Sequence, residues 1–144
     1  MPKFGNKSKE VLSWANPELR KVMEEAIKYV DFSVLESIRT EEQHNLNVQN
    51  GKSKTTWDKS KHRPRLDNEG RFTSWAIDIA PYPIDWNNYE RFIYVAGFIM
   101  CCAERLYTQG KITHKLRWGG DFNMNFNPKD DSFKDGGHFE LLGD

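Results

Sequence analysis

The sequence predicts a single α+β domain in which a small antiparallel sheet has about three helices packed around it. Segments with helical spacing of apolar residues are interspersed with short strand-like segments, an order that is typical of α+β folds. The 144 residues fit one domain with its own core, and no repeat, linker or low-complexity tract divides them. We therefore expect residues 1–144 to form one unit.

The first half of the chain contains two predicted helices with a strand between them. Asn16-Pro17-Glu18 is a typical helix start, with an Asn cap, a proline at the first helical position and an acid near the positive end of the helix dipole. Apolar residues then recur at helical spacing as far as Val30. The alternation from Phe32 to Ile38 predicts a strand, and Thr40 opens a second helix that ends near Gly51.

Two long polar loops separate the predicted elements of the second half. Residues 51–73 are polar, basic and irregular, and a loop of this length is usually functional or mobile. The other loop begins at Gly119 and ends before the last strand. The expected elements are a short buried strand from Trp75 to Ala80, a third helix capped by Asn87 or Asn88 and ended by Gly110, and strands at Lys115–Trp118 and Phe139–Leu142.

Composition and charge exclude several classes of function. The chain has 21 basic and 21 acidic residues, so no net field points to nucleic acid or to an acidic lipid surface. The longest apolar stretch, residues 92–103, is too short and too interrupted to span a bilayer. The adjacent Cys101 and Cys102 are unsuited to a mutual disulfide, and residues 1–7 lack the apolar core of a signal peptide. We expect synthesis in a cytoplasm, no nucleic-acid partner and no stable insertion into a membrane.

One polar loop resembles the start of a calcium-binding loop. Asp121, Asn123 and Asn125 have the spacing of its first ligands. Phe126 stands where the turn glycine is expected, and the bidentate glutamate is missing. A solvated loop is the favoured interpretation, and a weak second cation site is the alternative.

The four histidines differ in their surroundings. His44 lies among polar residues of a predicted helix and His114 lies in a turn, so we expect both to face solvent. His62 follows Ser60 in a polar loop, and His138 opens the last strand after a glycine pair. A lone histidine in such a place is usually not a ligand, whereas two, each near a carboxylate, are compatible with a metal site. Spacing alone leaves both interpretations open.

Asp78 interrupts the apolar strand from Trp75 to Ala80. A carboxylate in such a strand is costly unless it is paired or bound to a metal. One explanation is a salt bridge to Arg39 or Arg117. The other is a metal ion, which would supply the compensating charge.

Asp135 stands three residues before His138, with Gly136 and Gly137 between them. The glycines let the backbone turn sharply, so that Asp135 can face the same ion as His138 without binding it. That is the relation needed between a general base and a water that a metal activates. The alternative is a glycine-rich turn that Asp135 caps.

Taken in order, these motifs resemble the zinc peptidases that include D,D-carboxypeptidases and L-alanyl-D-glutamate endopeptidases, and most of all the small phage endolysins of that family. The similarity covers most of the chain, and the motifs are weak individually but specific in this order. They are Asn16-Pro17-Glu18-Leu19, Ser37-Ile38-Arg39-Thr40, Gly51-Lys52-Ser53, Ser60-x-His62, Ala76-x-Asp78, Trp118-Gly119-Gly120-Asp121 and Asp135-x-x-His138-Phe139-Glu140.

The resemblance implies a zinc metallopeptidase with one catalytic Zn²⁺. The implied ligands are His62, Asp78 and His138. Asp135 is the implied general base, and Arg39 is the cation that stabilises the oxyanion. The residues expected to bind substrate are Ser60, Tyr82 and Trp118.

The same resemblance implies the substrate and the place of action. We expect a peptidoglycan hydrolase that cleaves the stem peptide at the L-alanyl-D-glutamate bond. The alternatives are a D-Ala-D-Ala carboxypeptidase and a non-catalytic cell-wall-binding module. We expect a monomeric catalytic domain, residues 1–144, with no separate cell-wall-binding domain. It would be made in the host cytoplasm and would reach the cell wall in the periplasm through a pore made by another protein.

The chain departs from the family between the first two implied ligands. The family pattern S-x-H-x-x-G-x-A-x-D is interrupted by an insertion, residues 63–73, and Ser74 stands where the pattern has glycine. Asp67 within the insertion is a rival ligand for Asp78. The arginines of the insertion are expected either to hold carboxylates of the substrate or to form a solvated spacer.

Overall fold

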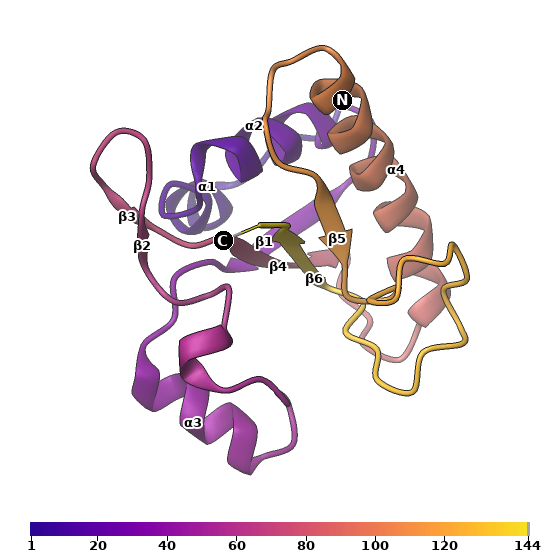
Figure 1. Cartoon of the computed structure of the whole chain (residues 1–144). Helices are drawn as coiled ribbons and strands as arrows, with labels where there is room; N and C mark the ends of the chain where they lie inside the picture. Colours follow the sequence, from indigo (N-terminus) through magenta and orange to yellow (C-terminus); the bar gives the residue numbers. More distant parts are fainter. Residues whose placement is uncertain (144) are drawn as a thin grey trace.

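A four-stranded antiparallel sheet organises the protein (Figure 1). The computed structural model describes residues 1–143. The predicted α+β fold with a small antiparallel sheet is confirmed, and the described residues form four α-helices where about three were expected. The strands lie in the order β1 (Phe32–Glu36), β4 (Ala76–Pro81), β6 (His138–Leu141) and β5 (Leu116–Trp118).

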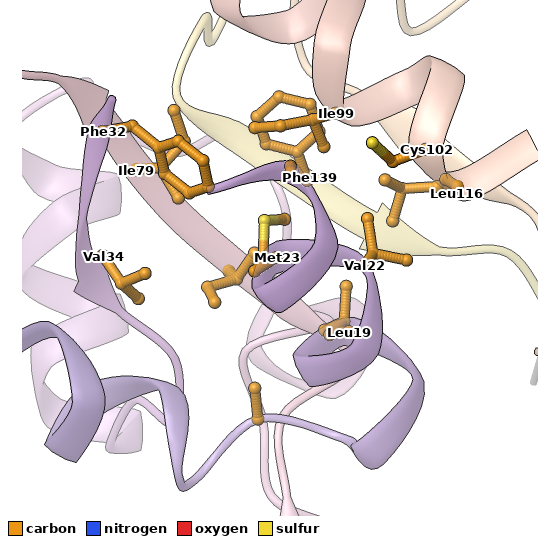
Figure 2. Packing of buried hydrophobic residues seen from close by; sticks show 14 of the residues in the cluster. Leu19, Val22, Met23, Phe32, Val34, Ile79, Ile99, Cys102, Leu116 and Phe139 are labelled. Atoms are coloured by element: carbon orange, nitrogen blue, oxygen red, sulfur yellow. The ribbon is translucent and has the colours of Figure 1, made fainter. Parts of the chain in front are cut away.

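Two helices build the core on one face of the sheet. The long α4 (Tyr89–Thr108) packs against β4 and β5, and α2 (Pro17–Ala26) packs against α4. Figure 2 shows side chains of α2 gathered with those of α4 and the strands, and the set is buried. The members that Figure 2 labels are Leu19, Val22, Met23, Phe32, Val34, Ile79, Ile99, Cys102, Leu116 and Phe139.

The alternation of side chains along β4 places a carboxylate opposite this core. Ile77 and Ile79 belong to the core cluster and have exposed fractions of 0% and 1%. Successive side chains of a strand point to opposite faces, so Asp78 faces away from the core. The strand therefore presents Asp78 on the face that carries the candidate site.

The remaining two helices come directly before α2 and directly after β1 in the chain. The short α1 (Asn6–Leu12) packs against β1, and α3 (Glu41–Gln49) extends from the far end of β1 next to the 3₁₀ turn η1 (Trp57–Lys59) (Figure 1). Thr40 caps α3, because its side chain accepts a hydrogen bond from the backbone N–H of Gln43.

Several local predictions are confirmed and others are wrong. Asn16 caps α2 by accepting a hydrogen bond from the N–H of Glu18, as expected. The first strand ends at Glu36, two residues before the predicted Ile38, and the last strand spans His138–Leu141 rather than Phe139–Leu142. The helix α1 was not predicted, because a seven-residue helix offers too few apolar positions to show a period.

The segment 51–73, predicted as irregular, contains ordered structure. Besides η1, it forms a hairpin of β2 (Arg65–Leu66) and β3 (Phe72–Thr73). The insertion relative to the family pattern is thus a hairpin that projects from the fold (Figure 1). Within residues 1–143, no helix has both the length and the hydropathy needed to cross a bilayer.

One carboxylate holds α2 against the turn that precedes β5. Glu18 accepts hydrogen bonds from the backbone N–H groups of Thr113 and His114 and from both of their side chains. Burial alone would raise the pKa of Glu18, but these hydrogen bonds lower it below its ordinary value of 4.5. The folded state therefore favours the charged form of Glu18.

We predict that Glu18→Gln lowers the free energy of unfolding at pH 7 by about 1–3 kcal/mol, because charge-assisted hydrogen bonds are lost. Since the pKa of Glu18 is lower in the folded state, its contribution is present above the unfolded value of 4.5 and is lost as the pH falls below it. Urea unfolding at pH 7 and pH 3 measures both effects. The exposed Glu24→Gln is the matched control. A Glu18→Gln deficit that stays constant with pH would contradict this assignment.

Candidate metal centre and active-site cavity

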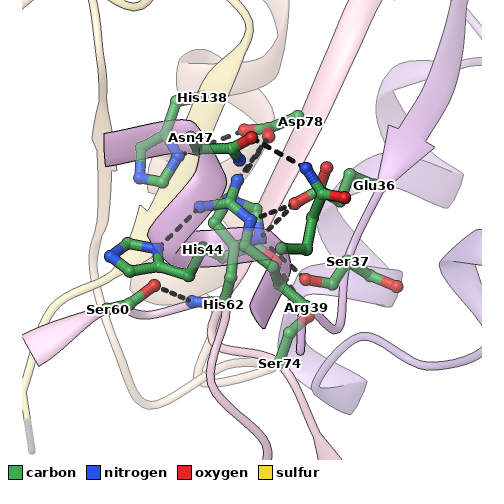
Figure 3. Close-up of polar contacts among 12 residues, drawn as sticks. Glu36, Ser37, Arg39, His44, Asn47, Ser60, His62, Ser74, Asp78 and His138 are labelled. Atoms are coloured by element: carbon green, nitrogen blue, oxygen red, sulfur yellow. Dashed lines mark hydrogen bonds and ion pairs between the residues drawn. The ribbon is translucent and has the colours of Figure 1, made fainter. Parts of the chain in front are cut away.

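Three side chains that are distant in the sequence meet on the face of the sheet opposite the core. His62, Asp78 and His138 each offer one ligand atom, and these atoms all lie within 4.8 Å of one another. His62 Nε2 is 3.3 Å from Asp78 Oδ2, and His138 Nδ1 is 3.1 Å from Asp78 Oδ1 (Figure 3). The structure thus brings together the three residues that the sequence proposed as ligands.

The backbone fixes the position of each of the three. Asp78 is paired with His138 in the register of β4 and β6. His62 lies in the loop after η1, where the N–H of Arg39 donates to its carbonyl. The N–H of Trp75 donates to the carbonyl of Lys61, so the chain returns to the same point after the inserted hairpin. The insertion therefore does not separate His62 from Asp78.

Hydrogen bonds on the far side of each imidazole determine which nitrogen faces the cluster. His62 Nδ1 is 2.7 Å from the carbonyl oxygen of Ser37, which accepts its proton. His62 Nε2 is buried and has no hydrogen-bond partner among the described residues. His138 Nε2 lies 2.8 Å from Glu140 Oε1, which leaves Nδ1 toward Asp78. These contacts orient the rings as in metal sites, where the second nitrogen of each ligand is held by an acceptor.

The electrostatics of the cluster favour a positive charge. Burial would raise the pKa of Asp78, but the two histidines hold it well below its usual range. Burial would likewise lower the pKa of His138, but the hydrogen bonds with Asp78 and Glu140 raise it to about 10. The carboxylates of Asp78 and Glu140 thus stabilise positive charge at this point, and a divalent metal ion is one group that could supply it.

Arg39 compensates part of the negative charge. Its side chain is 8% exposed, and its guanidinium contacts Glu36 and lies 3.5 Å from Asp78 Oδ2 (Figure 3). Of the two salt bridges considered for Asp78, the structure contains the one to Arg39, while Arg117 pairs with Glu140 at 2.9 Å.

The prediction that His44 faces solvent is wrong. Its exposed fraction is 1%, and its Nδ1 lies 3.2 Å from Arg39 Nη1. Arginine only donates, so Nδ1 accepts and Nε2 donates to the carbonyl of Thr55. A histidine on a helix without an apolar face gives no sequence signal of burial. The other histidine expected in solvent, His114, is partly buried against Glu18.

Asp135 lies beside the cluster without belonging to it. It lines the same cavity as His62 and His138, but the group of possible ligands contains only the other three residues. Burial and the charge of Asp78 raise the pKa of Asp135 above its ordinary value, although His138, His62 and Arg39 act against this. A carboxylate with a raised pKa beside this group of possible ligands is suited to take up and release protons.

Glycines let the turn that carries Asp135 approach the sheet. The N–H of Asp135 donates to the carbonyl of Gly119, and the N–H of Gly119 donates to the carbonyl of His138. A Cβ atom on Gly119 would lie 2.2 Å from the carbonyl oxygen of Asp135, and one on Gly137 would lie 2.3 Å from that of Ile79. The glycines of both motifs are therefore required by close packing of the backbone.

The cluster opens into a cavity of about 380 Å³. Its wall includes Ser60, whose hydroxyl accepts the N–H of His62. Among the described residues, Tyr82 and Trp118 do not line it: Tyr82 is 59% exposed elsewhere, and the indole of Trp118 donates to the carbonyl of Gly136. The substrate-binding roles of these three residues stay predictions.

Two aromatic residues of the cavity were missed by the sequence analysis. Phe122 and Phe133 line it from the loop that follows β5, and their rings are stacked 6.1 Å apart. Both lie in a polar loop where no periodicity indicates which side chains turn inward. No sequence signal could have selected them.

The carboxylates of Asp67 and Asp121, each considered above for a metal site, accept backbone hydrogen bonds within their own loops. Asp67 lies in the turn of the inserted hairpin, where it accepts the N–H groups of Glu69 and Arg71. Asp121 accepts the N–H groups of Asn125 and Phe126 within its own loop. The cation site around Asp121, Asn123 and Asn125 stays a prediction.

The fold and the site together define a class of protein. A small α+β domain carries two histidines and an aspartate with converging donor atoms, and a further carboxylate lies in the adjoining cavity. Two or three such ligands with an open position beside them are typical of metal-dependent hydrolases.

Comparisons with known proteins identify the family. A family model described as phage L-alanyl-D-glutamate peptidase matches residues 1–142, and the chain belongs to this family. The L-alanyl-D-glutamate peptidase of Escherichia phage T5 is 36% identical over 149 residues, covering 97% of this chain and 98% of that protein. The crystal structure of the Serratia marcescens L-Ala D-Glu endopeptidase ChiX aligns with a TM-score of 0.70 and 25% identity, over 97% of this chain and 90% of that chain.

We predict that Gly119→Ala displaces the turn from Asp135 to His138, because the added methyl group collides with a carbonyl oxygen. The expected loss of stability is about 1–3 kcal/mol, together with weaker metal binding. Thermal unfolding and a chelator competition measure the two effects. Gly97→Ala in α4 is the matched control, since its Cβ meets nothing within 4 Å. Unchanged stability and metal affinity in Gly119→Ala would contradict the packing argument.

Proposed function

We propose that the protein is a phage endolysin: a zinc-dependent peptidase that cleaves the stem peptide of bacterial peptidoglycan at the L-alanyl-D-glutamate bond. The observation that carries this proposal is the convergence of His62, Asp78 and His138 in a cavity that also contains Asp135. Family membership and the names of the two relatives support the substrate.

The donor set fits zinc. Two imidazole nitrogens and one carboxylate oxygen are ligands of catalytic zinc sites, which keep a fourth position open. The position of His62 Nε2 supports this fit, because the nitrogen is buried, makes no hydrogen bond within residues 1–143 and lies 3.3 Å from Asp78 Oδ2, where an ion between the two atoms would satisfy both. Zinc bound there would supply Lewis acidity, making water acidic enough to react near neutral pH and polarising the scissile carbonyl.

Asp135 is proposed as the general base and acid. Its carboxylate takes a proton from the attacking water and then delivers it to the nitrogen of the departing D-glutamate. Burial raises the pKa of Asp135, and a higher pKa makes the carboxylate a stronger base for the first step.

Arg39 is proposed to stabilise the oxyanion. Its guanidinium lines the cavity while it contacts Glu36, His44 and Asp78. These contacts use three of the five N–H donors that an arginine has, which leaves donors for the developing negative charge. The same contacts orient Asp78, so Arg39 has a structural part in the site as well.

The proposed setting rests on the resemblance to phage endolysins. The enzyme would act as a monomeric catalytic domain. It would be made in the host cytoplasm and would act on the cell wall in the periplasm once a separate pore-forming protein has released it.

Digestion of purified peptidoglycan tests the proposed bond. Mass spectrometry of the products should identify D-glutamate as the new amino terminus, and a chelator should abolish cleavage until zinc is restored. Release of free D-alanine would instead indicate a D,D-carboxypeptidase. Binding to the wall without any product would indicate a non-catalytic module.

We predict that Asp135→Asn retains one zinc per chain but loses turnover by roughly 100-fold or more, because an amide cannot accept the proton of the attacking water. Zinc analysis and a kinetic assay on soluble stem peptide measure the two quantities. Asp130→Asn, an exposed carboxylate of the same loop, is the control and should behave as the unmodified protein. Near-normal turnover of zinc-loaded Asp135→Asn would remove Asp135 from the mechanism.

A further inference from the structure

The lining of the cavity has an excess of positive charge. Two carboxylates line the cavity, those of Asp135 and Glu140. The same lining includes six cationic side chains, those of Arg39, Lys52, Lys54, Lys59, Lys61 and Arg117. Clefts lined by one sign of charge raise the local concentration of ligands of the opposite sign. The cavity is therefore suited to an anionic substrate.

The two arginines are neutralised within the protein, but the lysines of the segment 52–59 are not. Arg39 pairs with Glu36 and Asp78, and Arg117 pairs with Glu140. The exposed ammonium groups of Lys52, Lys54 and Lys59 have no ion pair to a carboxylate in residues 1–143, and that of Lys54 lies over the ring of Phe133.

Backbone contacts hold this lysine segment in place relative to the metal cluster. The N–H of Lys52 donates to the carbonyl of Asn47 at the end of α3. The carbonyl of Thr55 accepts the Nε2–H of His44, whose Nδ1 contacts Arg39 beside Asp78. The segment is therefore anchored to the same buried residues that surround the cluster.

The same lining contains two aromatic rings. Phe122 and Phe133 are stacked with an interplanar angle of 13°, and the ammonium group of Lys54 lies 4.9 Å from the centre of the Phe133 ring. The cavity thus combines ammonium groups and apolar rings with Asp135 and His138 in one lining. A peptide that carries both a carboxylate and apolar groups would match this lining.

We propose that Lys52, Lys54 and Lys59 form a subsite for the free carboxylate that lies next to the cleaved bond of the substrate. This inference rests on the proposed function. In the stem peptide, D-glutamate continues the chain through its side-chain carboxyl group, so its α-carboxylate remains charged on the same Cα that carries the scissile nitrogen. The subsite makes the enzyme selective for D-glutamate over its α-amide.

Two synthetic stem tripeptides provide the test, one with the D-glutamate α-carboxylate free and one with it converted to a primary amide. The zinc-loaded protein should cleave the acid with a kcat/KM about tenfold above that of the amide, the size expected of one charge-assisted hydrogen bond. In the variant Lys52→Gln/Lys54→Gln/Lys59→Gln, this ratio should fall to about twofold or less, as expected of screened residual charge.

A matched variant separates the subsite from net charge. Lys7→Gln/Lys9→Gln/Lys21→Gln removes the same number of exposed lysines from α1 and α2, outside the cavity, and should keep the tenfold ratio. The double variant Lys52→Gln/Lys59→Gln leaves the contact of Lys54 with Phe133 intact and should give an intermediate ratio. Circular dichroism and zinc content verify that each variant is folded and loaded.

The outcomes distinguish the subsite from the proposed function. Equal kcat/KM for acid and amide in the unmodified protein, or an unchanged ratio in the triple variant, would overturn the subsite while leaving cleavage established. If neither peptide is cleaved, the proposed function fails, and calorimetric dissociation constants of the same peptides then decide the subsite. A preference for the acid that disappears in the triple variant supports it, and equal binding overturns it.

Discussion

The carboxylate of Asp78 lies in the middle of β4, between two isoleucines that are buried in the core. A charge in such a strand requires a compensating charge. The structure provides it from three directions, by His62, His138 and Arg39. Each belongs to a different segment, so the side chains that stabilise this one carboxylate come from the loop after η1, the start of β6 and the turn between β1 and α3. The candidate centre follows from that convergence.

A second layer of contacts, made by Ser37 and Glu140, determines which nitrogen of each imidazole faces Asp78. The carbonyl of Ser37 and the carboxylate of Glu140 each hold one imidazole, so that the remaining nitrogens face Asp78. Burial would raise the pKa of Glu140, but its contacts with His138 and Arg117 lower it to about 2, so Glu140 is a charged acceptor. Mutations in this layer should therefore alter metal binding although they touch no ligand atom.

Local signals allowed much of this to be predicted. The Asn16 cap, the apolar strand that Asp78 interrupts and the glycines before His138 depend on residues that are close in the sequence. The resemblance to a family then assigned roles that spacing had left open. The burial of His44, the inserted hairpin and the inward turn of Phe122 were not predicted, because each depends on contacts between distant segments. A polar segment that folds against another polar segment has no periodicity to reveal it.

The proposed mechanism requires one zinc ion bound between His62, Asp78 and His138. The ion would be held through the imidazole nitrogens that do not contact Ser37 or Glu140. Anomalous diffraction at the zinc edge, from crystals of the zinc-loaded protein, tests this binding most directly. We expect one strong peak at about 2.0–2.2 Å from His62 Nε2, His138 Nδ1 and an oxygen of Asp78. A peak coordinated by His138 Nε2, or zinc bound only in the loop around Asp121, would contradict it.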